Sequence, residues 1–128
     1  MSLAFLATGY SKNVRIGYFH FNRMRLQIAR AYSEKHGKLY EEATSLRFSV
    51  NFDKIVDEWN KDCDDDLDIL LWHSDCDGSF SYQECRKIIK ALQKLTVVFE
   101  DKVLQNNYED FCAILTHCAK RRVKLVFC

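Results

Sequence analysis

The stretch HSDCDGSFSYQE, residues 73–84, joins a polar turn to the start of a helix and therefore decides how the chain on either side is arranged. Ser81 and Glu84 have the spacing of a capping box, in which each side chain accepts a hydrogen bond from the other residue's backbone amide. Two aspartates precede Gly78, and these residue types are typical of a turn. The sequence therefore predicts a loop that ends at Ser81 and a helix that begins there.

Outside this stretch, apolar residues recur at three- and four-residue steps, the pattern of amphipathic helices. Gly37 is a plausible C-terminal stop for the first helix, and Asn51 is the expected N-cap of the second. The segment Leu39–Ser45 is a candidate for a short helix of its own. The four predicted helices run from Tyr18 to Lys35, from Asn51 to the acidic stretch at Asp62, from Ser81 to about Leu95, and from about Asn107 to Cys118.

Two short segments are candidate strands. Ile69–Trp72 is a run of four apolar residues that fits either a buried strand or the last turn of a helix, and we favour the strand. Val123–Phe127 alternates loosely enough to be a terminal strand, and the two strands could pair if both form. The expected fold is α+β and predominantly α-helical, with about four helices and a small two-stranded sheet.

The composition indicates one domain, residues 1–128, because 48% of the residues are hydrophobic and the length leaves no room for a second. The net charge of +1 gives no general reason to expect nucleic acid or an anionic membrane as a partner. The chain contains no signal peptide pattern and no run of about 18 apolar residues. We therefore expect a soluble, cytoplasmic protein whose six cysteines are reduced thiols.

The segment His73–Glu84 resembles the twelve-residue calcium loop of an EF-hand, with Gly78 at the sixth place where the chain turns sharply. This single, degenerate loop covers about a tenth of the chain, as judged by the twelve-place pattern. The resemblance implies a metal site. Its implied ligands are His73, Asp75, Asp77, the backbone carbonyl of Ser79, and Glu84.

The first place of the loop leaves the identity of the metal undecided, because it holds His73 where EF-hands have aspartate. One imidazole with carboxylates suits manganese, ferrous iron, zinc or magnesium better than it suits a calcium sensor, because mixed nitrogen and oxygen ligands fit borderline metals. The predicted cofactor is therefore a divalent cation: calcium, magnesium, manganese or zinc. The loop with the following Glu84-Cys85-Arg86 also resembles small bacterial or phage-encoded proteins, which implies no activity.

Two other interpretations of the same residues stay open. The string His73-x-Asp75-x-Asp77 resembles the first metal-binding motif of the DHH phosphoesterases, which implies a metal-dependent phosphoester hydrolase. Alternatively, the aspartates form an ordinary turn and Glu84 serves only the capping box, so that no metal binds and the protein is purely structural or an assembly protein.

Together these patterns predict a small binding or interaction module rather than an enzyme. A basic cluster at Lys120–Lys124 and an acidic stretch at Asp57–Asp68 make the charge distribution uneven, although the net charge is near zero. The expected partner is another protein or a second copy of the chain. Nucleic acid is not expected, because the aromatic residues near Arg23 have the helical spacing of core residues.

Overall fold

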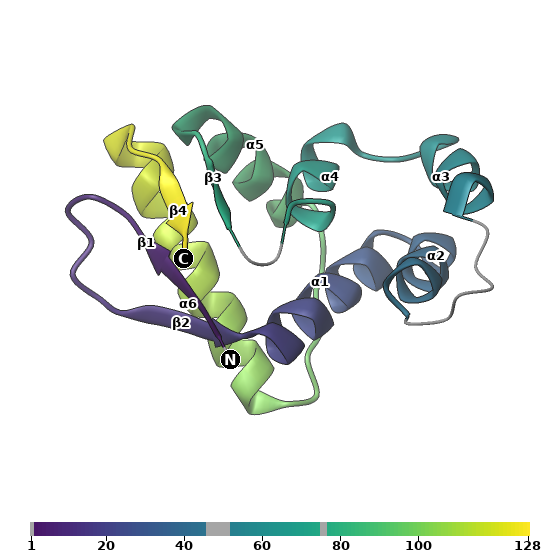
Figure 1. The fold of residues 1–128 in the computed structure, drawn as a ribbon, viewed down its shortest axis with the longest axis horizontal. Helices are drawn as coiled ribbons and strands as arrows, with labels where there is room; N and C mark the ends of the chain where they lie inside the picture. The colour runs from purple at the N-terminus through teal and green to yellow at the C-terminus, as the bar shows by residue number, and fades with distance from the viewer. Residues whose placement is uncertain (1, 46–51, 75–76) are drawn as a thin grey trace.

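The protein has an α+β fold in which helices predominate (Figure 1). The computed structural model describes residues 2–45, 52–74 and 77–128. Within these residues the chain forms six α-helices and one four-stranded antiparallel sheet. The α+β class is confirmed, whereas four helices and two strands were too few.

The sheet brings the two ends of the described chain together, with strand order β2-β1-β4-β3. Phe5 in β1 lies opposite Val14 in β2 on one side and Phe127 in β4 on the other. Phe80 in β3 lies opposite Leu125. The strands are β1 (Ser2–Leu6), β2 (Val14–Gly17), β3 (Gly78–Phe80) and β4 (Leu125–Phe127).

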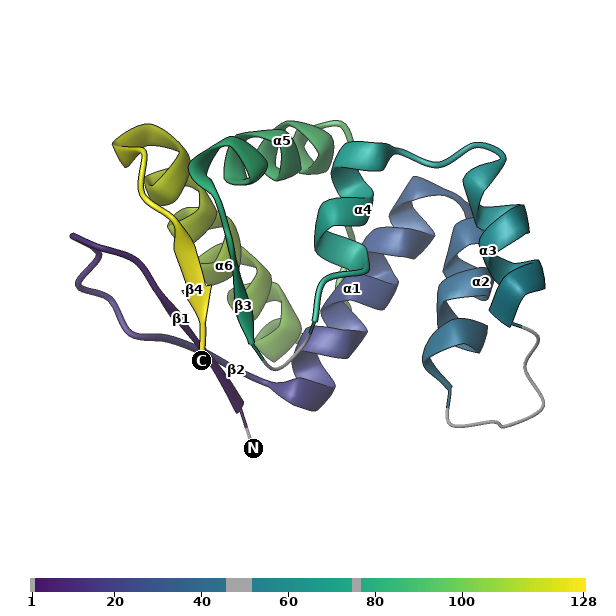
Figure 2. The same ribbon diagram turned by 45° about the horizontal axis from the view of Figure 1, so that its top comes forward.

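The helices extend the molecule away from the sheet (Figures 1 and 2). The last two helices lie side by side next to the sheet, and the second and third form the opposite end of the molecule. The fourth lies between the third and the fifth (Figure 2). The helices are α1 (Tyr18–Tyr32), α2 (Glu34–Thr44), α3 (Phe52–Asn60), α4 (Asp65–Leu71), α5 (Tyr82–Gln93) and α6 (Lys102–Arg121).

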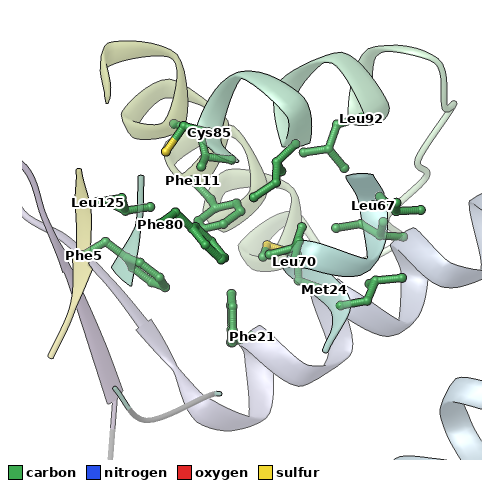
Figure 3. Packing of buried hydrophobic residues seen from close by; sticks show 14 of the residues in the cluster. Phe5, Phe21, Met24, Leu67, Leu70, Phe80, Cys85, Leu92, Phe111 and Leu125 are labelled. Atoms are coloured by element: carbon green, nitrogen blue, oxygen red, sulfur yellow. The ribbon is translucent and has the colours of Figure 1, made fainter. Parts of the chain in front are cut away.

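A cluster of buried phenylalanines holds the sheet against the helices (Figure 3). The Phe5 ring centroid lies 5.6 Å from that of Phe21 in α1 and 5.3 Å from that of Phe111 in α6. The ring of Phe127 in β4 packs on Phe5 from the neighbouring strand, at 4.9 Å. Because burial of a phenylalanine side chain stabilises a fold by roughly 1.5–3 kcal/mol, this cluster fixes the orientation of α1 and α6 on the sheet.

The predicted strand at Ile69–Trp72 is wrong, because Ile69 to Leu71 form the end of α4. Asp64 caps this helix by accepting from the backbone amides of Asp66 and Leu67, at 3.0 and 3.3 Å. Carboxylates in the first turn also favour a helix through its macrodipole. The predicted pairing of this segment with the C-terminal strand is wrong too, since β4 pairs with β1 and β3.

The predicted stop at Gly37 is also wrong. Helix α1 ends at Tyr32, Ser33 caps α2 by accepting from the amide of His36, and Gly37 lies inside α2. A Cβ on Gly37 would come within 2.5 Å of the Arg30 side chain, so the glycine permits close packing of the two helices. The segment predicted as a separate short helix, 39–45, is mostly the second half of α2.

Other elements also differ from prediction. Strands β1, β2 and β3 were not predicted, and β3 lies within the segment that was expected to be a loop up to Ser81. Helix α6 begins at Lys102, before the expected Asn107, because Asp101 accepts from the amide of Val103 at 2.7 Å as an N-cap. Asn51, the expected N-cap of α3, lies outside the described residues.

Candidate functional site

The candidate metal loop begins where α4 ends, and a buried arginine from α1 fixes that point. Arg25 is 5% exposed. Its Nη1 lies within hydrogen-bonding distance of three carbonyl oxygens at the end of α4: those of Leu70 at 3.3 Å, Leu71 at 3.4 Å and His73 at 2.7 Å. Carbonyls at a helix C-terminus lack the usual amide four residues on. The Leu70 carbonyl accepts from the backbone amide of His73 at 3.4 Å, and the guanidinium adds a charged donor to all three carbonyls.

The role of Arg25 was not predicted from the sequence. The signal was the spacing: Arg25 lies four residues after Phe21 and three before Ile28, both fully buried. Residues at these steps share one helix face. An arginine on the buried face needs several acceptors, and these come from α4.

His73 packs as an aromatic side chain at the start of the loop. Its ring centroid lies 4.5 Å from that of Phe80 and 4.6 Å from that of Phe127. Nδ1 lies 2.8 Å from the backbone carbonyl of Ser74, which only accepts, so Nδ1 carries a hydrogen and donates it. In the neutral ring, Nε2 is then the nitrogen with a lone pair for a ligand.

Gly78 turns the chain beneath this ring. Its φ of +102° is disfavoured for residues with a side chain. A Cβ there would lie 3.0 Å from Cε1 and 3.1 Å from Nε2 of His73. The sixth place of the loop therefore needs glycine both for its backbone angle and for the packing of the imidazole.

The other described residues of the predicted site have local hydrogen bonds. Asp77 Oδ1 accepts from the Ser74 hydroxyl at 3.2 Å, and Glu84 Oε1 accepts from the Ser81 amide at 2.9 Å in the predicted capping box. Ser79 lies in β3 opposite Val126, and Asp75 lies outside the described residues.

The described part of the loop does not bring its ligands together. The ligand atoms of His73, Asp77 and Glu84 are not all within 4.8 Å of one another, since among the described residues only Cys63, Asp65 and Asp68 form such a group. Metal binding at the loop stays a prediction.

The side chains of Cys63, Asp65 and Asp68 meet at the start of α4, which the sequence did not suggest. The thiol donates to Asp65 Oδ1 at 3.5 Å. Burial, together with the nearby carboxylates of Asp68 and Asp65, raises the pKa of the Cys63 thiol to about 11. A protonated thiol is a poor metal ligand. Hydrogen bonds within this group account for its close approach.

A groove between α3 and α4 has a volume of about 300 Å³. Its apolar lining is partly open to solvent: Phe52 is 52% exposed, and Val56 and Trp72 are each 41% exposed. The full lining is Phe52, Ile55, Val56, Trp59, Asn60, Asp68 and Trp72. The apolar spacing of α3 was recognised in the sequence, but the groove requires α4 as its second wall.

Trp59 forms the floor of the groove, and contacts with α2 and α4 fix its position. Trp59 is 3% exposed, and its Nε1 donates to Asp68 Oδ1 at 2.9 Å. Its ring packs against Trp72 at 4.9 Å and against His36 at 4.5 Å between centroids. The Trp59 carbonyl also accepts from His36 Nε2 at 3.1 Å. These contacts link α2, α3 and α4 and keep the aromatic floor in one orientation.

The chain around the groove is strongly acidic. Residues 52–72 contain eight carboxylates and two lysines, a net charge of −6 in a chain whose total is +1. The positive counterpart lies elsewhere: no acidic residue occurs between Ser2 and Ser33, which contain five arginines and lysines. The protein is therefore electrically polarised along its chain.

Two acidic side chains of this region are expected to respond oppositely to pH. Partial burial raises the pKa of Asp68, opposed by its hydrogen bonds from Trp59 and Cys63. Lys61 lowers the pKa of Glu58 through a hydrogen bond and its charge. A carboxyl whose pKa is raised in the folded state stabilises the fold at a pH below its pKa in the unfolded chain, about 3.9 for aspartate, and this stabilisation is lost as the pH rises. A carboxyl whose pKa is lowered in the folded state stabilises the fold at higher pH, and this stabilisation is lost as the pH falls.

We therefore expect Asp68→Asn to gain free energy of unfolding relative to the wild type as the pH rises from about 3 to about 7. The introduced asparagine side chain can still accept from the Trp59 indole, so the hydrogen bond is kept. Glu58→Gln, which loses the ion pair with Lys61, is expected to lose stability over the same range. Urea unfolding at both pH values measures the two differences, and a shared sign would contradict this assignment.

The loop and the groove adjoin at Trp72, which lines the groove and immediately precedes His73.

No helix of the described residues is both long and apolar enough to cross a membrane. Comparisons of the chain with protein-family models, with curated proteins and with solved structures found no match.

Proposed function

We propose that this protein is an interaction module that binds another polypeptide through the groove between α3 and α4. The observation that carries this proposal is the apolar lining left open to solvent, with Phe52, Val56 and Trp72 each at least 41% exposed around one cavity. Clustered exposed apolar side chains bordered by polar residues are typical of protein interaction sites. Two tryptophans in the lining add to this, because hot spots are enriched in tryptophan.

The dimensions favour side chains of a helix as the occupant. A volume of about 300 Å³ is at the lower end of the roughly 300–1,000 Å³ typical of ligand pockets, and the lining is partly exposed to solvent. Amphipathic helices bind in such grooves by inserting apolar anchors at three- and four-residue steps. One or two such anchors fit between α3 and α4.

The test is a titration with a helical peptide that carries leucine and phenylalanine on one face and glutamine and serine on the other. Both tryptophans of the chain line the groove, so their fluorescence reports binding directly. We expect saturable binding that Val56→Asp weakens at least tenfold, a loss of about 1.4 kcal/mol. Val98→Asp is the matched control, because Val98 is 68% exposed and outside the groove. Equal affinity of the wild type and Val56→Asp, or no saturable signal, would refute the proposal.

A second candidate function is binding of a divalent cation by the loop His73–Glu84. Two observations favour it: Gly78 has a positive φ at the sixth place, and the loop leads through β3 into α5 with Glu84 at the third helical position. The proposed ligands are His73 through Nε2, Asp75, Asp77, Ser79 and Glu84.

This candidate is tested by titrating the chelator-treated protein with calcium, magnesium, manganese and zinc while following tryptophan fluorescence. The double variant Asp75→Asn/Asp77→Asn is expected to abolish the response, and Asp66→Asn, outside the loop, to leave it unchanged. A response retained by the double variant would place the cation elsewhere. No heat of binding for any of the four ions in calorimetry would exclude the site.

A further inference from the structure

The groove has an acidic rim that lacks ion pairs within the described part of the protein. Asp53 and Asp57 precede the groove residues Val56 and Asn60 by three positions on α3, so they border its edge. Asp68 lines the groove from α4. Among the described residues, none of these three carboxylates belongs to an ion pair, whereas Glu58 pairs with Lys61 and Asp62 with Lys35. The rim therefore favours an occupant that carries positive charge.

The rim also excludes one arrangement of two copies. A symmetric dimer formed groove to groove would bring together two segments that each carry a net charge of −6. Like charges placed against each other across an interface disfavour association. If a second copy occupies the groove, it therefore uses a different face.

The first turns of α1 present such a face. Phe19 is 68% exposed, and the guanidinium of Arg23 lies over its ring, 5.7 Å from the centroid. The other large exposed apolar side chains of the described residues, outside the groove, are aliphatic: Leu6, Val98 and Val103. Among the described large exposed apolar side chains outside the groove, Phe19 is thus the aromatic one, and the guanidinium of Arg23 packs on its ring. The surrounding segment, residues 2–33, contains no carboxylate side chain.

We propose that the groove of one molecule binds the Phe19–Arg23 face of a second copy, head to tail. Phe19 inserts against Trp59 and Trp72, where aromatic pairs gain from edge-to-face contact. Arg23 faces the acidic rim. This inference rests on the proposed function and names its partner. Because the two surfaces differ, a pair of molecules still has one free groove and one free Phe19–Arg23 face, so the contact builds short chains of molecules or closed rings.

The interface is small, so the self-association is expected to be weak and sensitive to salt. Interfaces that bury little area are typical of transient encounters, and exposed ion pairs are screened at high ionic strength. We expect the average mass in sedimentation to rise as the protein concentration increases from about 10 μM to about 1 mM at low salt. A dissociation constant within this range corresponds to weak association. Raising the ionic strength to about 1 M is expected to weaken the association several-fold, because the Debye length falls to about 3 Å.

The decisive experiment mixes two variants that are each blocked on one surface. Phe19→Asp removes the inserted side chain and keeps the groove, whereas Val56→Asp blocks the groove and keeps the Phe19–Arg23 face. Each variant alone is expected to be monomeric. Their equimolar mixture is expected to form a 1:1 dimer and nothing larger, because only one productive pairing remains. Both positions are exposed, and far-ultraviolet circular dichroism checks that each variant is folded.

The other outcomes separate this inference from the proposed function. If the wild type stays monomeric at about 1 mM but still binds the helical peptide, the second copy is wrong and the groove binds another protein. If Phe19→Asp alone still self-associates, or the mixture forms no dimer, the head-to-tail contact is wrong. If the chain neither self-associates nor binds the peptide, both proposals fail.

Discussion

Arg25→Met is expected to lower the free energy of unfolding by about 3 kcal/mol, because the carbonyl groups at the end of α4 lose a buried charged donor. Methionine keeps an unbranched side chain of similar length, so little of the loss comes from an empty cavity. The bond to the His73 carbonyl, at 2.7 Å, is the shortest of the three and should contribute most. Urea unfolding followed by circular dichroism measures the change.

Two variants on the same helix make this prediction specific to the buried guanidinium. Arg25→Lys keeps the charge but offers one compact ammonium in place of a planar fork, so we expect an intermediate loss. Arg23→Met changes an exposed side chain and is expected to stay within about 0.5 kcal/mol of the wild type at low protein concentration. If Arg25→Met also stayed within that range, the carbonyls of α4 would have adequate partners without Arg25.

Phe111→Ala is expected to cost about 4 kcal/mol, the largest effect that we predict. Phe111 is fully buried, and its ring lies 5.3 Å from Phe5 in β1 and 5.9 Å from Phe21 in α1. Its removal leaves a cavity where sheet, α1 and α6 meet, and these three elements cannot all move to fill it. The midpoint of urea unfolding should fall accordingly, with native-like circular dichroism before the transition.

Phe19→Ala is the matched control for this substitution, because it removes the same group from an exposed position. At low protein concentration its free energy of unfolding is expected to stay within about 0.5 kcal/mol of the wild type. A loss below about 1.5 kcal/mol for Phe111→Ala would mean that the phenylalanine cluster relaxes around the gap, contrary to the packing described.

The sequence predicted the elements whose cause is local. The capping box of Ser81 and Glu84 marked the start of α5 correctly, since each side chain bonds to a backbone only three residues away. Asp64 and Asp101 are local caps of the same kind, but they occur in polar stretches that also fit a loop, and the helices they begin were displaced or mistaken. Helix starts could therefore be found where a clear apolar pattern follows, as at Ser81 and at Tyr18, where α1 begins without a side-chain cap.

The sheet depends on contacts that no local pattern contains. Phe5 in β1 pairs with Phe127 in β4, at the other end of the chain, and the short β3 completes the edge. With three to five residues in each strand, alternation gives too little signal to separate a strand from an apolar loop. The strands are specified by burial against the helices.

In the candidate site, too, the residues with a local role were predicted, and those that depend on distant contacts were not. The turn at Gly78 and the capping role of Glu84 follow from their immediate neighbours and were predicted. The contact of Arg25 with the loop and the groove between Val56 and Trp72 each join segments from different parts of the chain. Such sites become visible only when the packing of helices is known.

The position of β4 between β1 and β3 has a consequence for synthesis on the ribosome. Residues 2–17 emerge early, but β1 lacks its inner neighbour until residue 127 has been added. At about 5–20 residues per second, that interval lasts on the order of ten seconds. During this time the backbone groups on that edge of β1 have no strand partner, and chaperones that bind extended segments have their best opportunity to engage it.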